Sequence, residues 1–410
     1  MFKSIVCRER LMMPIFYILV YTIMTMYYYF NGKVYGDARG VDLEQPEVLF
    51  FSYLCVVTAT IVFFFLVSSI IRLIRVPVVS NRKYNVIHYI IFVMNVSYSI
   101  FSYKYNVGMS GVEIDQSVPK VLLYIFILIQ PVFLSYIYIA YFIESKDKIY
   151  YLNIIIFFIS VLLKGWLGVI IYLVILLFVK NKDYIMNNFL KFFICVVAFF
   201  IFAPLLKLFK DVIMAFHQFD SNDIIETARG YLEKRDLLNI LDVFNVYFFK
   251  LLGRIEHVSI SYYVNVVDLG FYNSIKQVYA EGWINERFYT AFTGANNEYV
   301  QKLLANQIYP YYSWQVQVPI PVRLSLGIEN VFVYLAYLSI VTLLWVLLFK
   351  IISNNEAMKS LNTFALFALL YHGWNYSVVL WVQSLIVFCI MLVVLRIFYS
   401  TFSKAKLNSI

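Results

Sequence analysis

The sequence predicts an all-α, polytopic membrane protein of about ten transmembrane helices with one large helical periplasmic loop. Of its 410 residues 62% are hydrophobic and only 14% are charged, whereas a soluble domain carries roughly 25% charged residues. Apolar runs of about 20 residues, the length that crosses a bilayer, recur along the chain. Basic residues favour alternate connections between these runs, which is typical of membrane topology. The lipid bilayer is therefore the expected solvent for most of the chain.

The spans are expected in the following order. Long apolar runs occupy 11–30, 49–71, 85–103, 119–143, 188–206, 327–349 and 376–398. Two shorter runs, 149–163 and 166–179, form either a tight helical hairpin or a re-entrant pair. A last short run near 360–374 brings the number to ten. The chain then divides into 1–206 with helices 1–7, a periplasmic loop over 207–326, and 327–410 with helices 8–10.

Charge predicts the orientation. Basic residues concentrate at the N-terminus, at the C-terminus and in alternate connections, among them Arg72, Arg75, Lys146, Lys180 and Lys350. By the positive-inside rule both termini lie in the cytoplasm, and the large loop lies in the periplasm of a bacterial inner membrane. The net charge of +9 belongs to these short connections because acids and bases nearly balance within the loop. It therefore does not indicate a nucleic-acid partner.

The large loop is predicted to be ordered. It is rich in aromatic residues and helix formers and lacks low-complexity stretches. Residues 237–264 read as one long, mostly apolar helix, either lying against the outer membrane face or forming a pair of extra spans. The whole chain holds 36 Tyr and 38 Phe, which suits interfacial belts or a surface that stacks on sugars.

Sequence motifs for nucleotide, metal or serine-hydrolase chemistry are absent. The four cysteines show neither metal spacing nor an obvious disulfide partner. We therefore expect no cofactor and no metal. Any chemistry must come from scattered charged groups at the outer face, and four candidates stand out.

The first candidate is Lys164, which interrupts two apolar runs before Gly165-Trp166-Leu167-Gly168. A cation at this depth is unfavourable unless it meets water or an anion. It is either a turn lysine that snorkels to the interface or a contact for a lipid-linked diphosphate.

The second candidate is the segment Gly253-Arg254-Ile255-Glu256-His257. On a helix, Arg254 and His257 share one face while Glu256 points elsewhere. Arg binds phosphate through two hydrogen bonds, and His acts as a base near neutral pH. The alternative is the solvated face of an amphipathic helix.

The third candidate is the end of the loop, where Arg287 precedes Pro319-Ile320-Pro321-Val322-Arg323. Arg323 would lie at the level of a lipid headgroup or diphosphate, or would simply anchor the next span. The fourth is His372, near the outer end of the ninth span, which is either a packing residue or a functional one.

These features resemble Wzy-type O-antigen polymerases. The resemblance covers the whole chain at the level of topology and rests on two short segments. Lys164-Gly165-Trp166-Leu167-Gly168 is similar to a segment in which relatives often carry Arg, so the Lys is a departure. Pro319-Ile320-Pro321-Val322-Arg323-Leu324-Ser325-Leu326-Gly327 is similar to the exit of the family's large loop.

The resemblance implies a polymerase of oligosaccharide repeat units linked to undecaprenyl diphosphate. His257, or else Glu256, would be the base, while Arg254, Arg323 and Lys164 would hold the diphosphate with Arg287 in support. Partners would be the lipid-linked oligosaccharide, membrane lipids and a chain-length-regulating membrane protein. No cofactor is implied.

Three other classes stay open. A flippase for lipid-linked oligosaccharides usually has more spans, shorter loops and charges within its bundle. An O-antigen ligase shares the polymerase's topology, and its acceptor distinguishes it. A lipid-to-sugar glycosyltransferase usually carries acids in a large first outer loop, which is short in this chain. A structural membrane scaffold is the remaining alternative.

Overall fold

The computed structural model is mostly helical. It describes residues 8–38, 40–80, 83–109, 114–164, 168–181, 208, 248–249, 252–253, 255–266, 300–308, 316–326 and 331–407. Two compact units divide the chain: unit 1 comprises 1–74, 249–345 and 363–378, and unit 2 comprises 75–248, 346–362 and 379–410. The units therefore combine segments from both sides of the 207–326 region.

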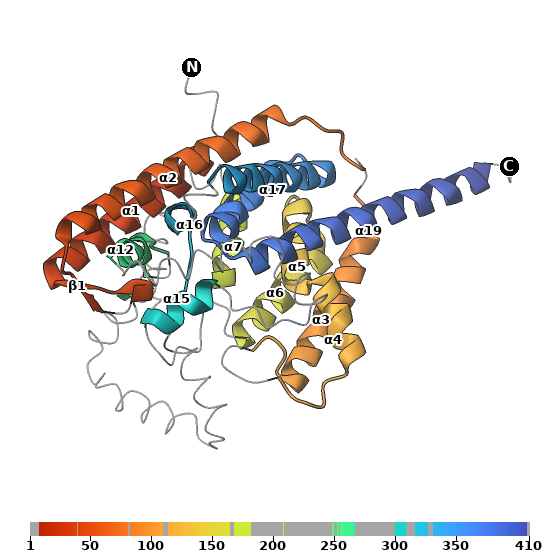
Figure 1. The fold of residues 1–410 in the computed structure, drawn as a ribbon. Coiled ribbons are helices and arrows are strands. Elements are labelled where there is room, and N and C mark those ends of the chain that lie inside the picture. Colours follow the sequence, from red (N-terminus) through yellow and green to blue (C-terminus); the bar gives the residue numbers. More distant parts are fainter. Residues whose placement is uncertain are drawn as a thin grey trace. The chain divides into compact units, whose positions relative to one another are not determined.

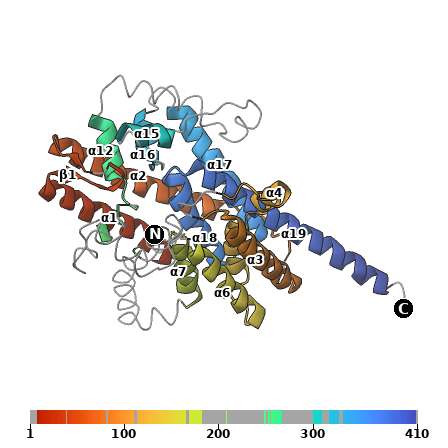
Figure 2. The same ribbon diagram turned by 90° about the horizontal axis from the view of Figure 1, so that it is seen from below.

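Unit 1 is built on a helical hairpin, seen in Figures 1 and 2 as two neighbouring helices. Helix α1 (Arg8–Asn31) and helix α2 (Pro46–Leu73) pack against each other. Between them lie β1 (Lys33–Val34), the 3₁₀ turn η2 (Gly36–Ala38) and β2 (Val41–Asp42). The two strands pair antiparallel, with Val34 opposite Val41.

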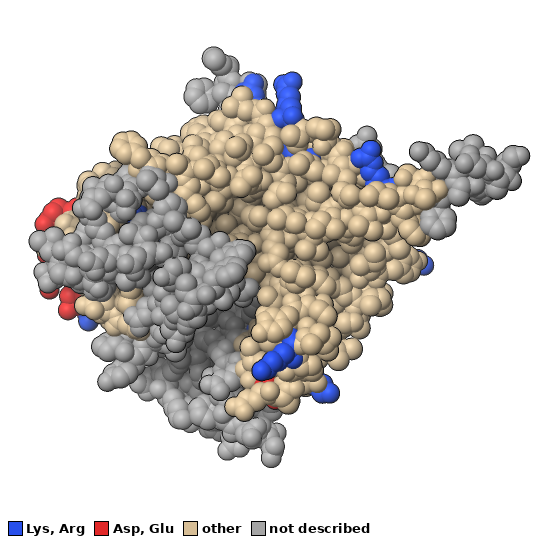
Figure 3. Space-filling view, turned by 45° about the vertical axis from the view of Figure 1, so that its right-hand side comes forward, with Lys and Arg blue, Asp and Glu red and all other residues tan. Residues whose placement is uncertain are grey.

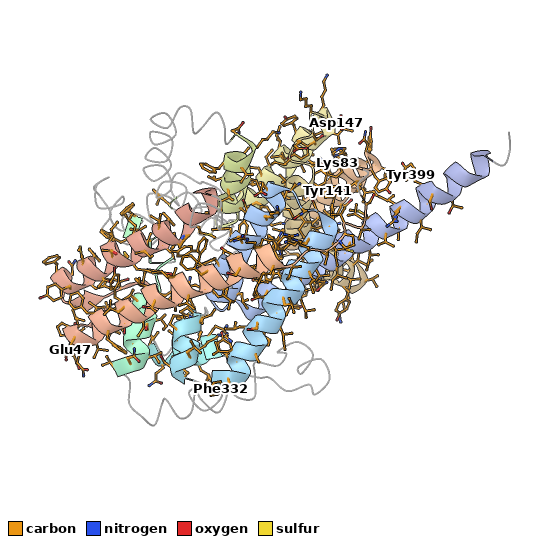
Figure 4. All side chains as sticks on the ribbon, turned by 90° about the horizontal axis from the view of Figure 1, so that it is seen from above. Glu47, Lys83, Tyr141, Asp147, Phe332 and Tyr399 are labelled. Carbon is orange, nitrogen blue, oxygen red and sulfur yellow. The ribbon has the colours of Figure 1, made fainter. Side chains whose placement is uncertain are left out.

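Local sequence sets the bounds of α2. Pro46 occupies the first turn, where its missing N–H is not needed. Glu47 in that turn and Arg72 in the last complement the helix dipole. Figure 4 labels Glu47 at this end of the helix.

Unit 1 also contains three shorter helices. They are α12 (Val258–Val266), α15 (Val300–Ile308) and α16 (Ile320–Leu326). Helix α12 packs on α1, α2, η2 and α16. The unit also holds most of α17 (Val331–Ile352), the end of α18 (Glu356–Ala365) and the π-helical η4 (Leu366–Tyr371).

Unit 2 contains the helices of the middle of the chain. These are α3 (Val86–Tyr105), α4 (Lys120–Ile129), α5 (Pro131–Tyr141), α6 (Lys148–Leu163) and α7 (Gly168–Lys180), together with most of α19 (Asn375–Leu407). Helices α4 and α5 are separated by Gln130 in the left-handed conformation (φ 52°) and by Pro131. This break lies inside the predicted span 119–143 because proline cannot continue the hydrogen-bond ladder.

Six described helices are long and apolar enough to cross a membrane. They contain Met13–Asn31, Pro46–Leu73, Val86–Tyr105, Lys120–Tyr141, Tyr334–Ile352 and Ser377–Thr401. The six corresponding sequence predictions are thereby confirmed as apolar helices. Two shorter apolar helices, Lys148–Leu162 and Ile171–Lys180, match the predicted short pair. The predicted span at 188–206 lies outside the described residues, and 360–374 is a short α-helix that ends as a π-helix.

The described surface agrees with a lipid environment. Large apolar side chains are exposed on it, with Phe332 at 87% and Phe30 at 81%. On the face drawn in Figure 3 the described residues are mostly tan, and the Lys, Arg, Asp and Glu side chains lie towards its edges. The chain is therefore a multi-pass membrane protein.

One sequence prediction is wrong. Residues 237–264 were expected to form a single helix, but the described part of this segment is interrupted after Leu252, and α12 begins only at Val258. Gly253 lies within the interruption, where its backbone lies close to that of Gly36: a Cβ at Gly253 would lie 3.0 Å from the Gly36 Cα. A continuous helix would not allow Glu256 to turn back onto the N-terminus of α12.

Candidate functional site

A row of buried tyrosines on α1 begins the site. Tyr17, Tyr21 and Tyr28 recur at helical spacing and are at most 3% exposed. Each hydroxyl contacts one ionisable side chain from a distant part of the chain. The contacts are Tyr17 with His372 Nε2 at 3.1 Å, Tyr21 with His257 Nδ1 at 3.0 Å, and Tyr28 with Glu256 Oε1 at 2.9 Å. We call these six residues together with Arg323 the polar cluster, and all of it lies in unit 1.

Glu256 fixes the start of α12. Its Oε2 accepts the backbone N–H groups of Val258 (2.7 Å) and Ser259 (3.0 Å). Its Oε1 accepts the Ser259 hydroxyl as well as that of Tyr28. A carboxylate here satisfies helix N–H groups that have no partner within the helix. Burial nevertheless raises the pKa of Glu256 to about 7, against the opposing effect of these hydrogen bonds.

The turn at Gly36 makes room for this carboxylate. Gly36 has φ +61°, and a Cβ there would overlap the Glu256 carboxylate and the Ser259 hydroxyl. The neighbouring Asp37 is also buried, and its Oδ2 accepts the backbone N–H of Gln317 at 2.8 Å. The short η2 turn therefore joins α1, α12 and the chain that leads to α16.

His257 and His372 form the centre of the polar cluster. Their rings meet edge to face, with centroids 4.2 Å apart and an interplanar angle of 87°. His257 is 0% exposed, and burial, followed by the nearby His372, lowers its pKa well below 6.5. His257 is therefore neutral at physiological pH. Its Nδ1 contacts Tyr21, while its Nε2 has no hydrogen-bond partner among the described residues.

Arg323 supports the segment that carries His372. Its Nε donates to the Val318 carbonyl (3.0 Å) and its Nη2 to the Gly373 carbonyl (3.2 Å). Gln301 of α15 donates to the same Gly373 oxygen at 2.9 Å. Gly373 has φ +78°, and a Cβ there would overlap the Val318 carbonyl. The buried Arg323 guanidinium thus binds the residue that follows His372 in the chain.

Lys164 belongs to unit 2. It ends α6 and is 3% exposed. Its Nζ lies 3.4 Å from the centroid of the Tyr98 ring, a cation–π contact. Lys164 is buried among the described residues, and both interpretations of it stay predictions.

The structure thus brings the adjacent residues Glu256 and His257 together with Arg323 and His372, which lie far from them in the sequence. Arg254 and Arg287 lie outside the described residues. The helical face expected for Arg254 and His257 does not apply because His257 precedes α12. Whether any of these residues is functional stays a prediction.

Sequence reasoning missed the partners of these residues. Tyr17 and Tyr21 lie in the predicted span 11–30, and their four-residue spacing, which places them on one face, is the signal that could have found them. Asp37 lies in the short connection after the first predicted span. Its position in Gly36-Asp37-Ala38, between a span and a hairpin, is the one local signal of a structured turn.

Metal binding finds no support in the described residues, where no group of three or more His, Cys, Asp or Glu side chains is placed to hold an ion. The polar cluster instead offers phenols, two imidazoles, a carboxyl and a guanidinium. Such a set can move a proton and stabilise negative charge.

Fold and site together define a multi-pass helical membrane protein with a buried polar cluster in one of its two units. Comparison with protein-family models, with curated proteins and with solved structures finds no match to this chain.

Proposed function

We propose that this protein is a membrane glycosyltransferase that polymerises lipid-linked oligosaccharide repeat units at the periplasmic face of a bacterial inner membrane. The observation that carries the proposal is the polar cluster. In this cluster the ring of the neutral His257 contacts the ring of His372, and Arg323 donates to the carbonyl of the next residue, Gly373. Both residue types match what the reaction requires: a base, and a cation for the diphosphate.

The location of the cluster also supports the proposal. Glu256 contacts Tyr28 near the end of α1, and Tyr262 of α12 accepts the backbone N–H of Glu44 just before α2. The basic residues Arg8 and Arg72 lie at the opposite ends of these two helices. By the positive-inside rule the cluster then lies in the outer half of the membrane, where lipid-linked repeat units would be presented.

The proposed step is a single displacement. A hydroxyl oxygen of the acceptor sugar forms a bond to the anomeric carbon of the donor glycan. The bond from that carbon to the diphosphate oxygen breaks, and the diphosphate leaves with the electron pair. His257 accepts the hydroxyl proton, and Arg323 stabilises the departing charge.

Deletion of the gene tests the function. The expected result is a surface polysaccharide with single repeat units in place of the ladder of chain lengths on a gel. Complete loss of repeat units would instead indicate a flippase or a ligase, and an unchanged ladder would refute the proposal.

Substitution at Arg323 tests the site in a complemented deletion strain. Arg323→Gln removes the charge, and we expect the ladder to disappear. Arg323→Lys keeps the charge but loses the pair of carbonyl contacts, so we expect a shortened ladder. The matched control is Ser325→Ala on the same helix, which removes only a bond to the Pro321 carbonyl. Blots of the membrane fraction must show equal amounts of each variant. A normal ladder for Arg323→Gln would refute the assignment.

A further inference from the structure

A row of buried polar residues follows one face of α3 in unit 2. His88, Asn95 and Ser102 are spaced by seven residues, or about two helical turns. From His88 to Ser102 this row extends about 21 Å along the helix axis, a large part of the roughly 30 Å hydrocarbon core of a bilayer. The face is turned towards α5 and α6, both of which pack on α3.

One end of the row reaches an exposed acid. His88 Nδ1 contacts the Tyr138 hydroxyl at 2.6 Å, and its Nε2 lies 3.3 Å from Asp147 Oδ2 without hydrogen-bond alignment. Asn153 donates to the same Tyr138 hydroxyl and to the backbone carbonyl of His88. The Asp147 side chain is 56% exposed. Figure 4 labels Asp147 close to Lys83, whose amine pairs with Glu144 at 3.5 Å.

The row continues towards the other end of α3. Ser135 donates to Asn95 Oδ1 at 2.9 Å. One turn beyond Asn95, the Tyr98 ring carries the amine of Lys164 on its face. Ser102 follows one further turn along the helix.

Five side-chain atoms on this path have no hydrogen-bond partner among the described residues, although each residue is at most 3% exposed. They are His88 Nε2, Asn95 Nδ2, Ser102 Oγ, Asn153 Oδ1 and Lys164 Nζ. Leaving one buried polar group unsatisfied costs about 1–3 kcal/mol. His88 Nε2 and Lys164 Nζ have the Asp147 carboxylate and the Tyr98 ring nearby, whereas the other three atoms have no such contact, and internal water is the usual partner for them.

We propose that these residues, which we call the polar seam (His88, Asn95, Ser102, Ser135, Tyr138, Asn153 and Lys164), hold a file of water molecules along which protons cross unit 2. Ionisable and polar residues within membrane helices commonly mark such proton paths. Hydroxyl, amide, imidazole and amine groups each donate or accept hydrogen bonds, as a water file needs. This inference does not depend on the proposed glycosyl transfer.

Proton flux into liposomes tests the proposal. The full-length protein is reconstituted into vesicles of phosphatidylethanolamine and phosphatidylglycerol that contain a pH-sensitive dye. A potassium diffusion potential set with valinomycin drives protons inward. We expect acidification several-fold faster than in protein-free vesicles. Equal rates with and without protein would overturn the proposal.

Variants show whether the flux follows the polar seam. Asn95→Leu and His88→Phe replace buried polar groups with apolar ones, and each should reduce the flux to the rate of protein-free vesicles. Thr342→Val is the matched control because Thr342 in α17 is also buried with an unpartnered hydroxyl but lies outside the seam. Flux that survives in both seam variants would refute the assignment, as would loss of flux in the control.

Correct folding is checked separately for each variant. Monodisperse elution in detergent and a Tm equal to that of the wild type would show that a variant without flux is intact. For a seam variant that fails these checks, Ser102→Ala is the milder replacement, and its unchanged flux would count against the path.

Discussion

Gly32 and Gly36 offer a sharp test of how the polar cluster is held together. Both have a left-handed backbone, with φ +63° and +61°. A Cβ at Gly32 would have no atom within 4 Å, whereas one at Gly36 would overlap the Glu256 carboxylate and the Ser259 hydroxyl. The two Gly→Ala substitutions therefore share one backbone penalty and differ only in crowding.

The expected magnitudes follow from these surroundings. Alanine in the left-handed region costs about 1–2 kcal/mol, so Gly32→Ala should lower stability by that amount. Gly36→Ala adds the cost of overpacking, about 1–3 kcal/mol, because the carboxylate must move away from its donors. The larger loss should appear for Gly36→Ala in the full-length protein.

Thermal unfolding of the purified protein in detergent, followed by tryptophan fluorescence, measures this difference. We expect Tm to fall more for Gly36→Ala than for Gly32→Ala. In a Glu256→Ala background the shortest overlap at Gly36 is removed and only those with the Ser259 and Tyr28 hydroxyls remain, so the difference between the two glycine substitutions should become smaller. Equal Tm values in the wild-type background would refute the role assigned to Gly36.

Three further predictions concern ionisable groups. The pKa of His257 is lowered, so the stability contributed by its neutral form is present above about pH 6.5 and is lost as the pH falls. The Tm of His257→Phe should therefore fall less than the Tm of the wild type on acidification. The pKa of Glu256 is raised to about 7, so its contribution is lost as pH rises through that value; Glu256→Gln should show a smaller fall in Tm from about pH 5 to pH 8, and a steeper fall would contradict the assignment. Lys164→Met removes a buried amine and should raise Tm, while shortening or abolishing the ladder. A ladder of normal length would argue against a substrate contact at Lys164.

Sequence was sufficient where one physical effect dominates. The cost of exposing apolar side chains to water makes runs such as 49–71 and 376–398 recognisable as spans without any partner. Local rules also fix their ends, as Pro46 does for α2. The break at Gln130–Pro131 was not predicted within the run 119–143, although Pro131 is a local signal for it.

Sequence prediction failed where a contact with a distant part of the backbone determines the local structure. The interruption before α12 depends on Gly253 meeting Gly36, more than 200 residues away, and no local propensity encodes that contact. Propensity favoured a continuous helix over 237–264, and tertiary packing overrode it.

By itself the sequence determined that this is a helical membrane protein, because composition and apolar run length act on each segment independently. It also singled out His257, Glu256, Arg323 and Lys164 as unusual residues for such a chain. Only the tertiary structure decided that the first three share one cluster with His372 and the tyrosines of α1. Those contacts join segments hundreds of residues apart, and they arise because each buried polar group must find its hydrogen-bond partner in three dimensions.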